Sequence, residues 1–302
     1  ENRVEVLEES KLDRCRDGTI FSFLNWACHK FLRAGVASPR LDAEILMAGG
    51  LRGSRTELMT HPDRVLNRAE ERMFCSRIER RVLREPVSHM TGVQEFWSLA
   101  FEVNEKVLTP RPETEILLEQ CLKAMAKTPA PVHILDLGTG SGILSIILAK
   151  EIPQSRVTAI EKSAEALEVA RKNAVRHAVM DRICFVAGDL MKVDWQGPYH
   201  LIVCNPPYIE SENLSKCMPE VRQYEPAQAL DGGRDGLDYY RFIVPMAWKK
   251  LEENGLLVLE IGHTQASAVI ALMQGSSRYQ DIQVIQDYSG YDRVVLARTV
   301  NG

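Results

Sequence analysis

The sequence has no long hydrophobic run and no excess of basic charge. No apolar stretch reaches the roughly 18 residues that a membrane-spanning helix needs, so we expect no membrane segment. The opening stretch, ENRVEVLEESKLDR, lacks the apolar centre of a secretory signal. The 302 residues carry 37 basic and 41 acidic side chains, a formal net charge of −4. Proteins that follow a phosphate backbone are usually strongly basic, so nucleic acid is a disfavoured partner.

Cysteine is sparse, and no two cysteines have the CxxC spacing of a metal or redox motif. The seven are scattered along the chain, at positions 15, 28, 75, 121, 184, 204 and 217. This pattern argues against a disulfide framework and a zinc ribbon, so we expect no metal and a reducing compartment, the cytoplasm. Hydrophobic residues make up 45% and charged residues 26%, which excludes a disordered or fibrous chain.

The N-terminal third of the chain has helical periodicity. Apolar side chains recur at helical spacing over residues 21–32, and Gly35 follows as a stop signal. Ser38 and Pro39 have the types typical of an N-cap and a first helical residue. Two later helix starts have capping-box spacing: Ser54 with Glu57, and Asn67 with Glu70. We therefore assign residues 1–87 to an N-terminal helical domain.

The last helix of this domain is rich in arginine. A solvated charged face is the simplest interpretation, and a patch that binds a partner is the alternative. The side chains concerned are Arg72, Arg77, Arg80, Arg81 and Arg84. Residues 1–87 hold 16 Lys/Arg and 14 Asp/Glu, a balance of +2, whereas the remainder holds 21 and 27, a balance of −6.

After Pro86 the pattern changes to β-structure. The stretch GVQEFWSLAFEVNEKVL alternates aromatic and β-branched residues with polar ones, which predicts a β-hairpin connector over residues 88–109. Further on we expect strands at 132–137, 156–161, 183–187, 199–204, 256–261, 281–287 and 293–298, and helices at 164–177 and 236–252. Apolar strands that alternate with amphipathic helices indicate an α/β domain over residues 110–302, with a mostly parallel sheet covered on both faces. Ligands of such sheets bind at the carboxyl ends of the strands.

A glycine-rich loop follows the first of these strands. It consists of Gly138, Thr139, Gly140, Ser141 and Gly142. Glycines let the backbone turn sharply and approach a ligand without an intervening Cβ. Dinucleotide-binding enzymes use a similar loop, but here Ile143 stands at the place of their third glycine. Asp136, just before the loop, would repel a pyrophosphate and suits a ligand with a cationic amino-acid end.

Two further acidic residues lie at or just after the ends of the next two strands. Glu161 ends the second strand, where a carboxylate can accept hydrogen bonds from both ribose hydroxyls. Asp189 follows the third strand, where an adenine ring could lie near it. A helix-capping or solvated carboxylate is the alternative for each. Together with Asp136 they favour S-adenosylmethionine (SAM), which has a positive sulfur and no phosphate, over NAD.

A rigid polar turn follows the fourth strand. It consists of Asn205, Pro206, Pro207 and Tyr208. The two prolines fix φ and remove two backbone donors. The side-chain carbonyl of Asn205 and the backbone carbonyl of Pro206 can grip both hydrogens of a planar –NH2 group, and Tyr208 can lie against its plane. A plain Pro-Pro turn is the alternative, but the position after the fourth strand of a SAM-type domain favours a methyl-acceptor site.

These elements together resemble a known family. DLGTGSG (136–142), Glu161 and NPPYI (205–209) match the pattern of amino-directed class I methyltransferases. TPRPETE (109–115) is similar to the signature of the HemK/PrmC-type protein-(glutamine-N5) methyltransferases, which modify class I peptide chain release factors. Further matching stretches are TGVQEFW (91–97), VRQYEPAQALDGGRDGLDYYR (221–241) and LEIG (259–262). The resemblance covers most of residues 20–298.

The resemblance implies a class I SAM-dependent methyltransferase fold with a seven-stranded, Rossmann-like sheet. It implies methyl transfer from SAM to the side-chain nitrogen of a glutamine in the GGQ-type loop of a release factor, with S-adenosylhomocysteine (SAH) as product. SAM binding is assigned to residues 138–142, Glu161 and Asn205, and acceptor binding to residues 205–208. Within this turn, we expect Asn205, Pro206 and Tyr208 to be the catalytic residues.

Several expected contacts depend on single positions of this sequence. Arg111 and Glu113, in the TPRPETE signature, are expected beside the acceptor. Leu190 stands where some family members have Trp, so it can cover the adenine but not stack on it. Thr109 in place of Ile, and Ser88-His89 in place of Tyr, are departures that leave the assignment unchanged. We name no general base, because the nitrogen becomes strongly acidic as it is methylated.

Four other functions compete with this interpretation. An adenine-N6 methyltransferase shares the NPPY turn but calls for a basic cleft, which the −6 balance of the catalytic part opposes. A glutamine methyltransferase for a ribosomal protein is disfavoured by PRPETE. A catalytically silent SAM-fold adaptor is disfavoured by the intact NPPY turn and glycine loop. An NAD-dependent oxidoreductase is disfavoured by Asp136 and by the GxGxG spacing. We also propose residues 1–87 as the module that docks the protein substrate.

Overall fold

The computed structural model describes residues 17–300 and divides into two compact units, Glu1–Gly92 and Val93–Gly302. Residues 1–16, which include the stretch examined for a secretory signal, and residues 301–302 lie outside the described part. Within residues 17–300, no helix has both the length and the apolar character needed to cross a membrane.

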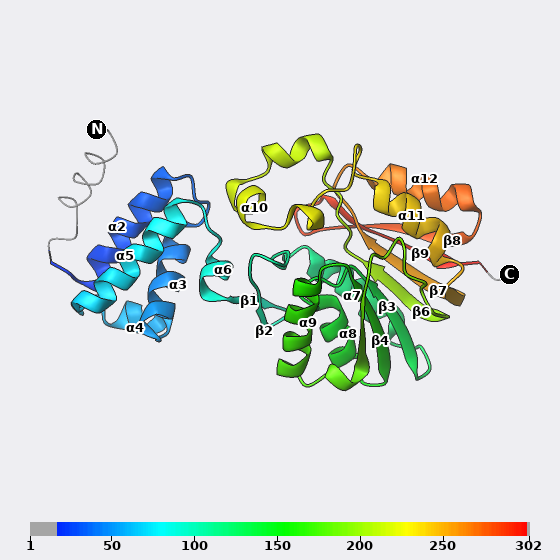
Figure 1. Ribbon diagram of the computed structural model, residues 1–302, viewed down its shortest axis with the longest axis horizontal. Coiled ribbons are helices and arrows are strands. Elements are labelled where there is room, and N and C mark those ends of the chain that lie inside the picture. The colour runs from blue at the N-terminus through cyan, green and yellow to red at the C-terminus, as the bar shows by residue number, and fades with distance from the viewer. Residues whose placement is uncertain (1–16, 301–302) are drawn as a thin grey trace. The chain divides into compact units, whose positions relative to one another are not determined.

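The first unit is helical (Figure 1). Its helices are α2 (Ile20–Arg33), α3 (Pro39–Leu51), α4 (Arg55–Thr60), α5 (Arg68–Val82) and α6 (Val87–Thr91). Gly35 follows α2 with a φ of 72°, the left-handed conformation of a helix C-terminus, so the predicted stop is confirmed. Both predicted capping boxes are formed, at the starts of α4 and α5. Ser38 is the N-cap of α3, but its side chain makes no capping hydrogen bond.

The arginines of α5 and its end do not form one solvated face, so that expectation is corrected. Arg81 is 5% exposed, and its Nε donates to Asp42 Oδ2 at 2.8 Å. Arg77 and Arg84 donate to backbone carbonyl oxygens of α3 and of the segment after α2, at 2.6 and 3.0 Å. A buried cation needs such partners, which lie far away in the sequence and leave no local signal. Arg72 is exposed, as expected.

The second unit begins with a two-stranded antiparallel hairpin, β1 (Val93–Phe96) and β2 (Leu99–Glu102). Its two turn residues, Trp97 and Ser98, have φ of 54° and 56°. Positive φ at both positions is typical of the tight two-residue hairpin turn, whose backbone twist matches that of the paired strands. The hairpin starts later than the predicted connector of residues 88–109, because the residues up to Thr91 form α6.

A seven-stranded sheet forms the body of this unit (Figure 1). Its strands are β3 (Val132–Leu137), β4 (Ser155–Glu161), β5 (Ile183–Ala187), β6 (Tyr199–Cys204), β7 (Leu251–Glu260), β8 (Tyr279–Gln286) and β9 (Asp292–Thr299). The spatial order is β5-β4-β3-β6-β7-β9-β8. The pairs among the first five are parallel, and β9 pairs antiparallel with both β7 and β8. The prediction of a mostly parallel seven-stranded sheet is confirmed.

Helices cover both faces of the sheet (Figure 1). They are α7 (Thr114–Met125), α8 (Ile143–Glu151) and α9 (Ala164–Arg176) on one face, and α11 (Asp238–Ala247) and α12 (Ala266–Ser276) on the other. Neighbouring residues of one strand serve opposite faces: Ile134 packs with the first set of helices and Leu135 with the second. Strands buried on both faces need continuous apolar sequence, which is why they were predictable.

The segment between β6 and α11 carries short helical elements and part of the site. They are η2 (Ser211–Lys216), α10 (Pro219–Tyr224) and η3 (Ala227–Ala229). The helix predicted over residues 236–252 ends earlier, at Ala247, because Leu251 already pairs with Tyr199 as the start of β7. The carboxyl ends of β3, β4, β5 and β6 lie at one edge of the sheet, as the parallel pairing requires.

Candidate active site

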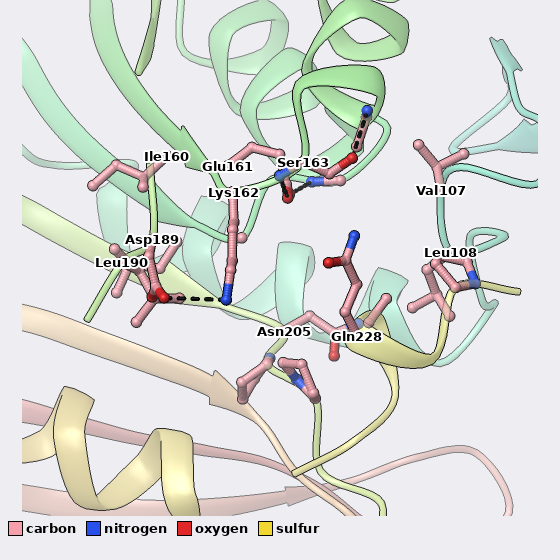
Figure 2. Close-up of a pocket in the computed structure, with 18 of the residues that line it drawn as sticks. Val107, Leu108, Ile160, Glu161, Lys162, Ser163, Asp189, Leu190, Asn205 and Gln228 are labelled. Carbon is pink, nitrogen blue, oxygen red and sulfur yellow. Dashed lines mark hydrogen bonds and ion pairs between the residues drawn. The ribbon is translucent and has the colours of Figure 1, made fainter. Parts of the chain in front are cut away.

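The first cavity opens at this edge of the sheet (Figure 2). Each strand contributes through the residues that follow or end it: Gly138 and Gly140 after β3, Glu161 at the end of β4, Asp189 and Leu190 after β5, and Asn205 and Pro206 after β6. The structure therefore brings together residues that the sequence singled out separately across nearly 70 positions. This is the place where open parallel sheets bind ligands.

The glycine loop leaves an open face toward this cavity. Gly138 and Gly140 have φ of 74° and 55°, and a Cβ built on either would meet no atom within 4 Å. A ligand can therefore approach the backbone there without obstruction. Gly142 has a different reason to be glycine, because a Cβ there would lie 3.1 Å from Ala170 Cβ. Thr139 and Ser141 line a smaller adjoining cavity, which Asn205 also lines.

Asp136 lies beneath the loop, is fully buried and is not among the residues that line the first cavity. Its Oδ2 accepts hydrogen bonds from Thr139 Oγ1 at 2.6 Å, from Ser145 Oγ at 2.6 Å and from Ser145 N at 3.2 Å. Burial raises the pKa of Asp136 to about 6, in spite of these hydrogen bonds. Asp136 therefore fixes the shape of the loop from below.

Glu161 faces the first cavity while its carboxylate holds the loop. Oε2 accepts from Gly140 N at 2.9 Å, and Oε1 accepts from Ser163 N at 2.9 Å. Each carboxylate oxygen has a second lone pair, so both remain available to ligand hydroxyls. The side chain thus connects the glycine loop of β3 with the loop after β4.

Asp189 and Leu190 form the next part of the wall. Asp189 Oδ1 accepts from Met191 N at 3.0 Å, and its Oδ2 lies 3.2 Å from Lys162 Nζ. The Met191 hydrogen bond, with help from the Lys162 charge, lowers the pKa of Asp189, so this carboxyl is ionised at neutral pH. Leu190 is 7% exposed and presents an apolar surface to the cavity, without an aromatic face.

Sequence reasoning missed several residues of this cavity. Lys162 is one of them. It comes directly after Glu161, the acidic residue at the end of a predicted strand, and this position was the signal that could have identified it. Gln228, from η3, extends toward the side of the cavity where Glu161 and Ser163 lie (Figure 2). Gln228 belongs to the stretch 221–241 that the resemblance marked as a whole. No residue-level signal distinguished it there.

The turn at Asn205 to Tyr208 separates the first cavity from a second one. Asn205 and Pro206 line both cavities, whereas Tyr208 lines only the second. The second cavity also contains Leu108, Pro112, Ile209, Cys217, Met218, Val221, Ala229, Leu230 and Glu260. Burial raises the pKa of Tyr208, which therefore stays neutral. A group held at this turn would be reachable from both sides.

Two glycines pack directly against the backbone of this turn. A Cβ on Gly232 would lie 2.8 Å from Tyr208 Cα, and a Cβ on Gly236 would lie 2.4 Å from Tyr208 O. Gln265 Nε2 donates to Tyr208 O at 3.0 Å and to Gly236 O at 3.2 Å. The segment DGGRDG therefore supports the turn from behind, and only glycine allows so close an approach.

The TPRPETE signature borders the second cavity. Arg111 and Glu113 both line it. Arg111 forms an ion pair with Glu225, at 2.6 Å between Arg111 Nη2 and Glu225 Oε2. Burial raises the pKa of Glu225, and the Arg111 charge opposes this. The pair ties the signature to the segment after α10, so Arg111 has a structural partner in addition to its place at the cavity.

Comparison with known proteins connects this geometry to a family. The PrmC N-terminal domain model matches residues 22–92, and the methyltransferase small domain model matches residues 112–221. A methyltransferase structure from Pyrococcus furiosus has a TM-score of 0.53 at 18% identity and covers 75% of this chain and 100% of its own. That likeness concerns the fold alone, and with the methyltransferase small domain match it confirms the predicted class I methyltransferase fold.

Two relatives are much closer in sequence. A release factor glutamine methyltransferase from Geobacter sulfurreducens is 39% identical over 280 residues, which are 93% of this chain and 96% of the relative. Another, from Caulobacter vibrioides, is 40% identical over 263 residues, which are 87% of this chain and 90% of the relative. Similarity of this level along nearly the whole length places the chain in the release factor glutamine methyltransferase family.

Proposed function

We propose that this chain transfers a methyl group from SAM to the side-chain amide nitrogen of a glutamine in a class I peptide chain release factor. The observation that carries the proposal is that Asn205 and Pro206 line two cavities at once. A cofactor in the first cavity and a glutamine side chain in the second would meet at these two residues. The names of the relatives supply the acceptor protein.

The residues of the first cavity fit SAM. The open faces of Gly138 and Gly140 leave room that any Cβ would fill, and Ile143 stands where a dinucleotide-binding loop has its third glycine. Glu161 has free lone pairs for the ribose hydroxyls, and Asp189 and Leu190, which line the same cavity, would border the adenine. When bound there, SAM supplies an electrophilic methyl group on a positively charged sulfur. SAH would remain in the same cavity after transfer.

The turn offers two free acceptors for the amide. Within residues 17–300, no hydrogen bond reaches Asn205 Oδ1 or the carbonyl oxygen of Pro206. A primary amide has two N–H hydrogens, and two fixed acceptors hold its nitrogen in one orientation. The amide lone pair is delocalised into its carbonyl, which makes the nitrogen a poor nucleophile. Correct positioning contributes on the order of 7–11 kcal/mol in well-aligned systems, so orientation by Asn205 and Pro206 is the main catalytic contribution.

The second cavity suits a glutamine side chain. Leu108, Val221 and Leu230 give it apolar walls for the two methylene groups. The Arg111–Glu225 pair places both charges in contact with each other. An uncharged carboxamide would therefore meet the two acceptors of Asn205 and Pro206. The charges of Arg111 and Glu225 are already paired with each other. Tyr208, neutral and largely buried, lies on the same side and can cover the amide plane.

We further propose that residues 1–87 dock the release factor. The turn would accept any planar amine of suitable size, so recognition of a whole protein needs another surface, and standard stable interfaces bury about 1,200–2,000 Å². In the helical unit, Phe21, Leu32 and Leu83 are 55%, 64% and 67% exposed, so this unit has apolar side chains that a partner could cover. Arg72 adds an exposed charge, which would make association sensitive to salt. We place the reaction in the cytoplasm.

A methyl-transfer assay with a panel of acceptors tests the function. The full chain and SAM with a labelled methyl group are incubated with an intact release factor, a ribosomal protein or duplex DNA. We expect label in the release factor alone and loss of labelling with Asn205→Ala. Asn213→Ala, which removes an asparagine that lines neither cavity, should keep the activity. Label in DNA or in the ribosomal protein, but not in the release factor, would refute the proposal.

A further inference from the structure

Three stretches of sequence meet in one hydrogen-bond chain behind the turn. Asn205 Nδ2 donates to Thr114 Oγ1 at 3.3 Å, and Thr114 Oγ1 donates to Glu260 Oε2 at 2.7 Å. Thr114 and Glu260 are each 1% exposed. Thr114 is the first residue of α7 and Glu260 the last of β7, so both lie on regular elements that hold them in place.

We propose that Thr114 and Glu260 are positioning residues that fix which way the Asn205 amide points. Their hydrogen-bond chain directs Asn205 Oδ1, rather than Nδ2, toward the methyl acceptor. The inference rests on the proposed function for the identity of that acceptor. It gives Thr114, and Glu260 at the wall of the second cavity, a role that is exerted through Asn205.

The direction of the chain follows from counting hydrogens. An ionised carboxylate only accepts hydrogen bonds, and a hydroxyl has a single hydrogen to donate. Thr114 gives this hydrogen to Glu260 and can therefore only accept from Asn205. The donor of Asn205 is Nδ2, so Oδ1 is left for an external donor. A flipped Asn205 would bring two oxygens together with no hydrogen between them, which leaves buried polar atoms unsatisfied.

Protonation of Glu260 would reverse this order. A neutral Glu260 can donate to Thr114, whose own hydrogen is then free for Asn205 Oδ1. Asn205 would in that case present its –NH2 group to the amide hydrogens of the substrate, and donors would face donors. The ionised form of Glu260 is thus the one that supports the grip on the acceptor.

The groups around Glu260 set where this change occurs. Burial raises the pKa of Glu260 to about 7, while the hydrogen bond from Thr114 and the charge of Arg293 oppose the increase. The nearby charge of Glu113 raises it further, and Asn205 contributes a hydrogen bond that lowers it. Other titratable groups that interact with Glu260 are Cys204, Tyr208 and Tyr240. Because burial keeps all three neutral, Arg293 and Glu113 are the charges that face Glu260.

The orientation of Asn205 can be followed without any substrate. The full chain is labelled with 15N in its asparagine side chains, and the Asn205 signal is identified by its loss in Asn205→Ala. We expect this signal to shift with pH, with an inflection near the pKa of Glu260. Glu260→Gln and Thr114→Val should remove the inflection, and Thr114→Ser should keep it. Thr299→Val, which removes a buried hydroxyl bonded to Glu252 O, should leave the signal unchanged.

Single-turnover methylation of the intact release factor gives the second readout. The wild-type rate should rise with pH through the ionisation of Glu260. In Thr114→Val it should fall between about tenfold and a hundredfold, the scale of a misplaced reacting group, with SAH affinity within about threefold of wild type. In Glu260→Gln the pH dependence should be flat. Thr114→Ser should restore the rate.

The two readouts separate the possible failures. If the wild type methylates the factor and the Thr114 and Glu260 variants match its rate at every pH, the positioning role is wrong. An Asn205 signal that is insensitive to pH in the wild type would refute it as well. If the wild type transfers no methyl group to glutamine, the proposed function fails, and the Asn205 signal alone decides the positioning role.

Discussion

Replacing Glu161 by alanine should weaken cofactor binding more than it destabilises the chain. Its carboxylate holds Gly140 N and Ser163 N, each at 2.9 Å, and faces the first cavity. The loop has other supports, because Gly138 N and Thr139 N donate to Ile160 O at 2.9 and 3.1 Å. The loop should therefore keep its course while its ligand-binding carboxylate is lost.

The magnitude follows from the hydrogen bonds that the ribose would lose. Hydrogen bonds to a charged group contribute about 1.5–3 kcal/mol each, and part of this is recovered from water in the open cavity. A loss of about 1–3 kcal/mol corresponds to a Kd for SAM or SAH that is roughly 5 to 150 times larger. Glu161→Gln should lose a similar amount, because one of its two atoms becomes a donor that faces a backbone N–H.

Titration calorimetry with SAH measures this effect directly. Glu168→Ala is a matched control, because the Glu168 side chain is 70% exposed and lies on α9. We expect it to bind SAH as the wild type does. Thermal unfolding without ligand shows whether each variant is folded. Unchanged SAH affinity in a folded Glu161→Ala protein would refute the ribose-binding role, and tight binding of NAD by the wild type would refute the cofactor assignment.

Three further predictions follow from the structure. Gly236→Ala should strongly reduce methyl transfer but spare SAH binding, because the new Cβ would lie 2.4 Å from Tyr208 O and the φ of Gly236 is 74°. Gly275→Ala is the control: a Cβ there meets no atom within 4 Å, so it should be neutral in the same assays. The pKa of Asp136 is raised from 3.8 to about 6, so its contribution to stability is greatest below about pH 4 and is lost as the pH rises through 6. Urea unfolding should show this decline, and a wild-type curve no steeper than that of Asp136→Asn would contradict it. Removal of residues 1–92 should preserve SAH binding and greatly reduce methylation of the intact factor, and equal methylation rates would exclude docking by this part.

The sheet and its loops could be predicted because their signals are local. The strand over 132–137 is a mostly apolar run that leads into glycines, and the structure has β3 at the same residues. The turn at Asn205 was recognisable from its composition and its place after a strand. Parallel pairing then brings the strand ends together at one edge, so the cavity residues that follow the strands could be predicted, whereas Lys162 and Gln228 could not.

The contacts that were not predicted depend on tertiary packing. The hydrogen bond between Thr114 and Glu260 joins residues 146 positions apart, and neither neighbourhood predicts the other. Arg81 was expected in solvent, but its ion pair with Asp42 connects α5 to α3 inside the helical unit. The hydroxyls of Thr139 and Ser145 donate to the Asp136 carboxylate under the loop, and the sequence did not predict these partners. In each case the sequence indicated a charged group, while the direction of the side chain was set by its packing partners.

Tandem mass spectrometry of an intact release factor after incubation with the full chain and SAM tests the central claim most directly. We predict one added methyl group, located by peptide fragmentation on the side-chain nitrogen of a single glutamine in an exposed loop. We also predict its absence when Asn205→Ala replaces the wild type. An unmodified glutamine in the wild-type reaction, or a methyl group on any other residue of the factor, would contradict this account.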